Sequence, residues 1–161
     1  MKRVFGILFI FALVLLVFTA CTNEPSQPDD PMLPNNPNPE EVTKMFITIN
    51  GNKIEVELAQ NSSVEALVER LKKGDITYTA NDYGGFEKVG NLGFSLPTSN
   101  TEITTQAGDV ILYAGNQIVL FYGSNTWSYT RLGKINGYSD SELSSLLGAG
   151  LGSIQVTISL N

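Results

Sequence analysis

Apolar and polar residues alternate in two adjoining stretches near residue 50, and this pattern predicts a β-hairpin. Residues 45–50 and 53–58 each place their apolar side chains on one face of an extended chain. Asn50 and Gly51, which lie between them, suit a tight turn that requires positive φ. A similar apolar pair at 109–113 and 117–122 predicts a second hairpin.

Two other stretches have the period of a helix. The first carries one apolar stripe at spacings of three and four residues, formed by Val64, Leu67, Val68 and Leu71. Ser62 and Glu65 fit a capping box at its start, and Gly74 suits its end. A second capping box at Ser139 and Glu142 predicts a short helix that buries Leu143, Leu146 and Leu147.

Short apolar stretches between glycine-rich turns predict the remaining strands. They lie at 76–80, 86–89 and 154–160, with one or two more within 125–135. Residues 96–98 are expected to form an irregular connection. About eight short strands with two short helices make the fold class mainly β, and a closed eight-stranded barrel would leave no exposed sheet edge.

The start of the chain has a different pattern. Met1, Lys2 and Arg3 precede 17 residues without charge, and a small residue, Ala20, stands before Cys21. A basic start, an apolar stretch and a small-residue exit are the three parts of a secretory signal. The segment resembles the signal of bacterial lipoproteins, with Phe18 where leucine is usual, and an uncleaved membrane anchor is the alternative. The sequence therefore predicts a signal peptide at 1–20 and lipidation, such as palmitate attachment, at Cys21.

A proline-rich segment follows the cysteine. Six of the seven prolines fall within residues 21–42, separated mainly by Asn, Asp and Glu. Such a composition cannot bury enough apolar surface to offset the entropy of ordering. We therefore expect a lipidated, disordered tether at 21–42, although its PxxP spacing also fits a ligand for an aromatic groove. The tether would display a single domain formed by residues 43–161.

Composition and charge exclude several classes of function. Loss of Lys2 and Arg3 with the signal would leave 16 acidic and 8 basic residues, a net charge of −8, so no nucleic-acid partner is expected. Cys21 is the only cysteine, and no spaced set of metal ligands is present. The sequence thus indicates no cofactor, no metal site and no catalytic residue, since without histidine no nucleophile–base pair can be proposed.

Two longer stretches resemble one known family. Residues 45–71 and 96–135, the latter with Gly-Asp-Val-Ile-Leu-Tyr at 108–113 and Tyr-Thr-Arg-Leu-Gly-Lys-Ile at 129–135, are similar to bacterial cyclophilin-like domains. The resemblance implies an eight-stranded barrel closed by helices. Enzymes of the cyclophilin type use an arginine, a glutamine, several aromatics and a histidine around a proline groove. This chain has no histidine, and its arginine and aromatics do not fall in the enzyme's motifs.

A group of aromatic residues near an arginine is the candidate ligand-binding site. It consists of Tyr122, Trp127, Tyr129 and Arg131. If 127–131 is a strand, its alternate side chains share one face. Aromatic rings beside a guanidinium can hold a peptide carbonyl or a carboxylate. In the alternative, the aromatics pack in an ordinary barrel wall and Arg131 pairs with a nearby acidic residue.

These observations predict a membrane-tethered, extracytoplasmic lipoprotein whose barrel binds a peptide, a small ligand or a protein partner without isomerase activity. A divergent peptidyl-prolyl cis-trans isomerase acting on exported proteins is the alternative, and a structural envelope protein is the third hypothesis. The membrane partner would be reached through the lipid on Cys21. Thr22 follows that cysteine in place of the aspartate that retains lipoproteins at an inner membrane, so a host with two membranes would sort it to the outer one.

Overall fold

The computed structural model describes residues 42–161. The predicted signal peptide, the lipidation site Cys21 and almost all of the predicted tether lie outside the described residues. Within 42–161, neither helix is both long and apolar enough to span a bilayer.

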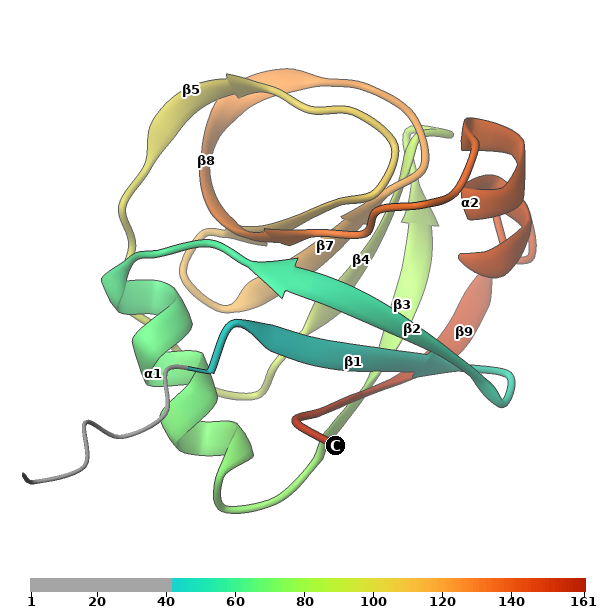
Figure 1. Ribbon diagram of the computed structural model, residues 1–161. Coiled ribbons are helices and arrows are strands. Elements are labelled where there is room, and N and C mark those ends of the chain that lie inside the picture. Colours follow the sequence, from blue (N-terminus) through green and yellow to red (C-terminus); the bar gives the residue numbers. More distant parts are fainter. Residues whose placement is uncertain (1–41) are drawn as a thin grey trace, which may run out of the picture. The chain divides into compact units, whose positions relative to one another are not determined.

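Nine strands and two helices make up this part of the chain (Figure 1). The helices are α1 (Ser62–Leu71) and α2 (Asp140–Leu146). The strands are β1 (Lys44–Ile49), β2 (Asn52–Leu58), β3 (Ile76–Tyr83), β4 (Glu87–Asn91), β5 (Thr101–Thr104), β6 (Asp109–Tyr113), β7 (Gln117–Phe121), β8 (Thr126–Lys134) and β9 (Ser153–Ser159).

Eight of the strands form a closed antiparallel barrel, as the sequence predicts. The order is β2-β1-β9-β3-β4-β7-β6-β8, and β8 pairs again with β2 to close the sheet. Both predicted hairpins are present, and Asn50 and Gly51 have φ of 50° and 81° in the first turn. Closure gives each of these eight strands a hydrogen-bonded neighbour on both sides. The barrel therefore has no open sheet edge on which another chain could add a strand.

The region 125–135 forms a single strand, β8, that serves two sheets. Its second half pairs with β6 and β2, whereas its first half pairs with β5, a ninth strand that the sequence does not predict. Gly133 lies opposite Val110 and Arg131 lies opposite Ile111, so Leu132 is an extra residue in β8. The bulge lies within the part of β8 that pairs with β6, and the change of partner from β6 to β5 comes two residues earlier, between Thr130 and Tyr129.

The barrel interior contains the larger of two hydrophobic cores, and both helices contribute to it. Leu67 from α1 and Leu143 from α2 are almost fully buried in this core. Figure 1 shows the two helices on opposite sides of the barrel. Leu147 is also buried, while Leu146 is only partly so. The helices therefore close the ends of a packed barrel, not of an open channel.

The two helix starts differ in how far the sequence predicts them. Ser139 and Glu142 form the expected capping box of α2. The capping box expected at Ser62 and Glu65 is wrong, because Asn61 is the cap of α1 and its Oδ1 accepts hydrogen bonds from the backbone of Ser63 and Val64, both at 3.0 Å. An asparagine amide also donates, and Asn61 Nδ2 bonds to the carbonyl of Arg131, 2.8 Å away. Asn61 therefore serves as the cap in place of Ser62, because its side chain both caps α1 and joins the helix to β8.

A second, smaller core lies on the outer face of the sheet. It consists of Ile111, Val119, Phe121 and Tyr129, with Phe86, Val89 and Ile103 packed against it. Residues 118 and 120 of β7 belong to the interior core, so residues 119 and 121 point outward, as the two-residue period of a strand requires. An apolar cluster on the outside of a barrel needs cover from solvent, and β5 supplies part of it through Ile103.

Candidate functional site

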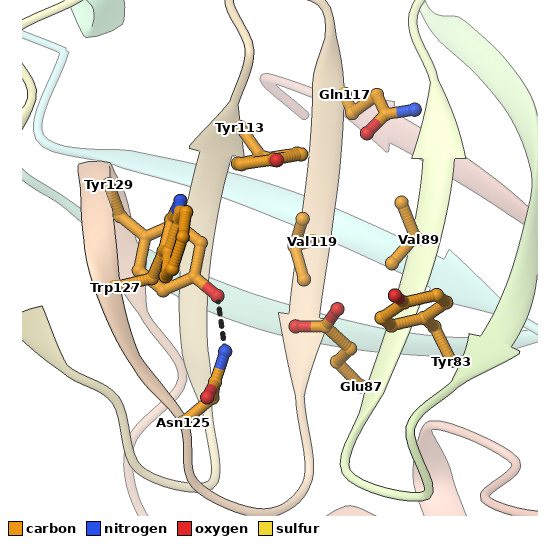
Figure 2. Close-up of a pocket in the computed structure, with 9 residues that line it drawn as sticks. All are labelled: Tyr83, Glu87, Val89, Tyr113, Gln117, Val119, Asn125, Trp127 and Tyr129. Carbon is orange, nitrogen blue, oxygen red and sulfur yellow. Dashed lines mark hydrogen bonds between the residues drawn. The ribbon is translucent and has the colours of Figure 1, made fainter.

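A pocket of about 460 Å³ opens on this outer face, above the second core (Figure 2). Strands β4, β6, β7 and β8 contribute its floor and walls, together with the end of β3. Its lining residues are Tyr83, Glu87, Val89, Tyr113, Gln117, Val119, Asn125, Trp127 and Tyr129. A volume of this size is typical of pockets that hold a small molecule or a few side chains.

Aromatic rings form much of the pocket's surface. Trp127, Tyr83 and Tyr113 are 57%, 66% and 38% exposed, which is unusual for residues of this size. They are three of the five large hydrophobic residues that are exposed within 42–161. Exposed apolar residues that cluster around a pocket indicate a binding surface, whereas single exposed apolar residues are common on any protein.

One aromatic residue of the pocket, Tyr129, is held in place by its neighbours. Tyr129 is 4% exposed, and its ring packs edge-to-face against Phe121 and Tyr113 at 5.7 and 6.0 Å between centroids. Its hydroxyl accepts a hydrogen bond of 2.8 Å from Asn125 Nδ2 (Figure 2). Asn125 is held in turn by hydrogen bonds of its backbone with the hydroxyl of Thr105. This wall is therefore set before any ligand arrives.

Glu87 is the only charged residue among those that line the pocket, and it is buried. It lies at the start of β4, 6% exposed, with its carboxyl group directed into the pocket (Figure 2). Its Oε2 has no hydrogen-bond partner among the described residues. Burial raises the pKa of Glu87 to about 7, because the charged carboxylate loses hydration. The pocket thus contains a carboxyl group that changes charge near neutral pH.

The four predicted site residues are divided among three places. Trp127 and Tyr129 both line the pocket. Arg131 lies on the same strand, but beyond the pocket, where its Nη1 contacts Asp109 Oδ1 at 2.5 Å. Lys134 Nζ lies 3.0 Å from the same carboxylate oxygen. Arg131 is thus paired as the packing alternative expects, and the pocket is lined without it.

Tyr122, the fourth predicted residue, faces the other side of the sheet. It packs against the interior core, and its hydroxyl donates to Asp82 Oδ1 at 3.0 Å. Lys88 is fully buried beside it, with Nζ 2.8 Å from Asp82 Oδ1 and 2.7 Å from the carbonyl of Gly152. Burial and the neighbouring carboxylate of Asp82 raise the pKa of Tyr122 to about 12, so the phenol stays a donor. These hydrogen bonds and the ion pair connect β3, β4 and the segments that carry Tyr122 and Gly152 at this end of the barrel.

Reasoning from sequence did not identify Glu87, Tyr83, Tyr113 or Gln117 as pocket residues. They come from four strands that meet only in the folded sheet, and each has the ordinary sequence surroundings of a strand end. Only Glu87 could have been recognised from the sequence. It is a charged residue between Phe86 and Val89, which both pack on the outer apolar face, and a charge at such a position is unusual. Within 42–161, no three His, Cys, Asp or Glu side chains gather as a metal site would require.

Comparison with known proteins agrees with this architecture. The chain is similar in structure to a hypothetical protein from Archaeoglobus fulgidus, with a TM-score of 0.56, 18% identity, and coverage of 74% of this chain and 95% of that one. It is also similar to McbB, solved in complex with tryptophan, with a TM-score of 0.54, 14% identity and 71% of this chain covered. The match spans only 44% of McbB. No curated protein matches the sequence.

The family is shown by the sequence itself. The sequence model of the cyclophilin-like family matches residues 47–159, which include every strand of the barrel except part of β1. The chain belongs to the cyclophilin-like family.

Proposed function

We propose that this protein is an extracytoplasmic lipoprotein, anchored through a lipid on Cys21, whose barrel is a binding module for a peptide, a small ligand or a protein partner. The observation that carries the binding role is the outward pocket with three exposed aromatic rings, Tyr83, Tyr113 and Trp127. Exposure of such rings to water lowers solubility and has no benefit for the barrel core, whereas a ligand that covers them gains apolar contact.

The position of the pocket favours a partner presented from outside. The barrel interior is filled by core side chains, so a ligand reaches the aromatic rings only on the outer face. The predicted anchor and tether would hold the domain at a membrane, where exported or surface proteins are available. The net negative charge of the chain favours partners that are neutral or basic.

A direct test is selection of peptides from a random display library on the full chain in detergent. We expect enriched peptides that bind wild type and lose at least tenfold in affinity to the double variant Y83A/W127A. Glu102, an exposed residue of β5 outside the pocket, supplies the control variant E102Q. If no peptide is enriched, or if Y83A/W127A binds as wild type does, this binding site is wrong.

Family membership supports one second candidate, a divergent peptidyl-prolyl cis-trans isomerase. The two arginines of the described residues do not line the pocket, because Arg131 pairs with Asp109 and Arg70 stacks over Phe94 at 4.7 Å. We therefore expect binding without turnover. An isomerisation assay with a proline tetrapeptide checks this, and a rate above background that W127A removes would favour the enzyme.

A further inference from the structure

Among the described residues, Glu87 takes part in no ion pair. The basic residues on the neighbouring strands are used elsewhere. Lys88 pairs with Asp82 on the opposite face of β4, and Arg131 and Lys134 both pair with Asp109. A buried carboxylate without a partner is costly, and protein structures retain one mainly where a ligand or a reaction uses it.

The surroundings of Glu87 are those that an organic cation prefers. Tyr83 stands beside the carboxyl group, and the rings of Trp127, Tyr129 and Tyr113 lie across the pocket (Figure 2). The faces of tyrosine and tryptophan rings attract cations through their quadrupoles, more strongly where water is excluded. A carboxylate adds a charge-assisted hydrogen bond to any N–H of the cation. Together these groups match both the charge and the apolar stem of an alkylammonium.

A metal ion is a poorer match for the same pocket. Calcium and magnesium take six or more oxygen ligands, whereas Glu87 is the only carboxylate among the lining residues. The remaining oxygens belong to amides and phenols spread over different strands. The aromatic walls therefore select a cation that carries its own apolar surface.

We propose that the pocket binds an organic cation, the head group of a lysine-like amine, with Glu87 as its counter-ion and the rings of Tyr83, Trp127 and Tyr129 around it. This inference rests on the proposed function and deepens it, because it names the chemistry of the ligand. The same ammonium group can come from a lysine side chain in a peptide or from a free amine, and the experiment separates these sources.

Trp127 is the only tryptophan of the chain, so its fluorescence reports on this pocket in the full-length protein. The probes are acetyl-Ala-Lys-Ala-amide, its neutral counterpart with norleucine in place of lysine, and the free diamine cadaverine. We expect the lysine peptide to bind at least tenfold more tightly than the norleucine peptide, and E87Q to abolish that preference. E102Q removes the same formal charge outside the pocket and is expected to keep the preference, which controls for the negative charge of the whole chain.

Each outcome has a defined meaning. Cadaverine that binds as tightly as the lysine peptide points to a free amine, and a tighter lysine peptide points to a protein or peptide ligand; both support the proposal. If the norleucine peptide binds equally well, or if E87Q keeps the preference for lysine, the cation proposal is overturned while the pocket remains a binding site. If neither peptides nor cadaverine bind, and library selection on the same protein also enriches nothing, the proposed function falls with it.

Discussion

Arg131 and Asp109 pair on the neighbouring strands β8 and β6, with Nη1 and Oδ1 2.5 Å apart. Asp109 is 3% exposed and also accepts from Lys134 Nζ and from the backbone N–H of Gln106. Burial opposes ionisation of Asp109, but these hydrogen bonds outweigh it and hold the pKa of its carboxyl group below the usual range. The pair thus fixes the barrel wall and keeps the arginine away from the ligand pocket.

Replacement of Asp109 tests this structural role. We expect D109N to lower the free energy of unfolding at neutral pH by about 3 kcal/mol, because it removes the partner of two cations. The pKa is lowered in the folded state, so the stabilisation is present above the unfolded pKa of about 4 and is lost as pH falls through the folded value. Urea denaturation at neutral and acidic pH measures both effects.

The control for D109N is E102Q, which changes an exposed carboxylate of β5. It should alter stability by no more than about 0.5 kcal/mol, as ordinary surface changes do. Equal stabilities of D109N and E102Q at neutral pH would contradict the role assigned to the pair.

The two aromatic residues of β8 should respond differently to truncation. Y129A empties a buried position that packs on Phe121, so it should cost about 3–5 kcal/mol of stability. W127A removes a side chain that is 57% exposed, so it should cost about 1 kcal/mol or less while it weakens binding of a selected peptide about tenfold. Denaturant unfolding and calorimetric titration check the two effects. A W127A protein that binds normally would exclude Trp127 from the site.

The E87Q variant should be more stable than wild type in one range of pH only. The pKa of Glu87 is raised to about 7 in the folded protein, so as pH rises from about 4.5 to 7 the unfolded chain releases its proton first and stability falls. Glutamine avoids this loss, and we expect E87Q to be more stable by on the order of 2 kcal/mol at pH 8 and equal to wild type at pH 4. Denaturant unfolding at both pH values measures the difference, and a pH-independent difference would contradict the assignment.

Binding of the lysine peptide should depend on pH through the same group. Below about pH 7 the proton competes with the cation for Glu87, so the affinity of wild type should fall by up to tenfold per pH unit. The other titratable groups that line the pocket are the phenols of Tyr83 from β3, Tyr113 from β6 and Tyr129 from β8. Burial raises the pKa of Tyr129, and burial together with the carboxylate of Asp82 raises the pKa of Tyr122, whose hydroxyl lies on the other face of the sheet. The charged residues Asp82 and Lys88 pair with each other on the other face of the sheet.

Fluorescence titration between pH 5 and 8 checks this dependence, with E87Q as the matched control. E87Q should bind weakly and equally throughout. An affinity of wild type that rises as pH falls would mean that the protonated carboxyl group donates to a neutral ligand, and it would refute the cation.

The predicted anchor has its own test. C21A should abolish incorporation of labelled palmitate and release the protein from the membrane fraction, because no other cysteine can accept a thioether-linked lipid. Fractionation of cells that express wild type and C21A measures this. A C21A protein that stays membrane-bound would favour the uncleaved apolar anchor instead.

Local pattern was sufficient to predict most of the barrel. The Asn50-Gly51 turn, the capping box at Ser139 and the alternation in β9 depend on neighbouring residues alone, so they can be read without the fold. The strand β5 was missed because Thr101–Thr104 is short, polar and half outside the barrel, and only its pairing with β8 makes it a strand. The cap at Asn61 was missed for a similar reason, since its second contact is 70 residues away.

The candidate site was less accessible to such reasoning. Trp127 and Tyr129 were identified because alternate residues on one strand share a face. Tyr122 was grouped with them by closeness in sequence, although it directly follows the outward Phe121 and so points inward. The partner of Arg131 lies 22 residues away and across a bulge, which no local pattern reveals.

The neighbouring residues Glu87 and Lys88 carry opposite charges to opposite faces of β4. If β4 slid by one residue against β3 and β7, the lysine would enter the aromatic pocket and the glutamate would meet Asp82 inside the barrel, carboxylate against carboxylate. Such a slip would break a buried ion pair and create a like-charge contact, at a combined cost that few misfolded alternatives can offset. The dipeptide therefore makes a shifted register of β4 unfavourable. The carboxylate that we propose for ligand binding also helps the chain to fold with a single strand alignment.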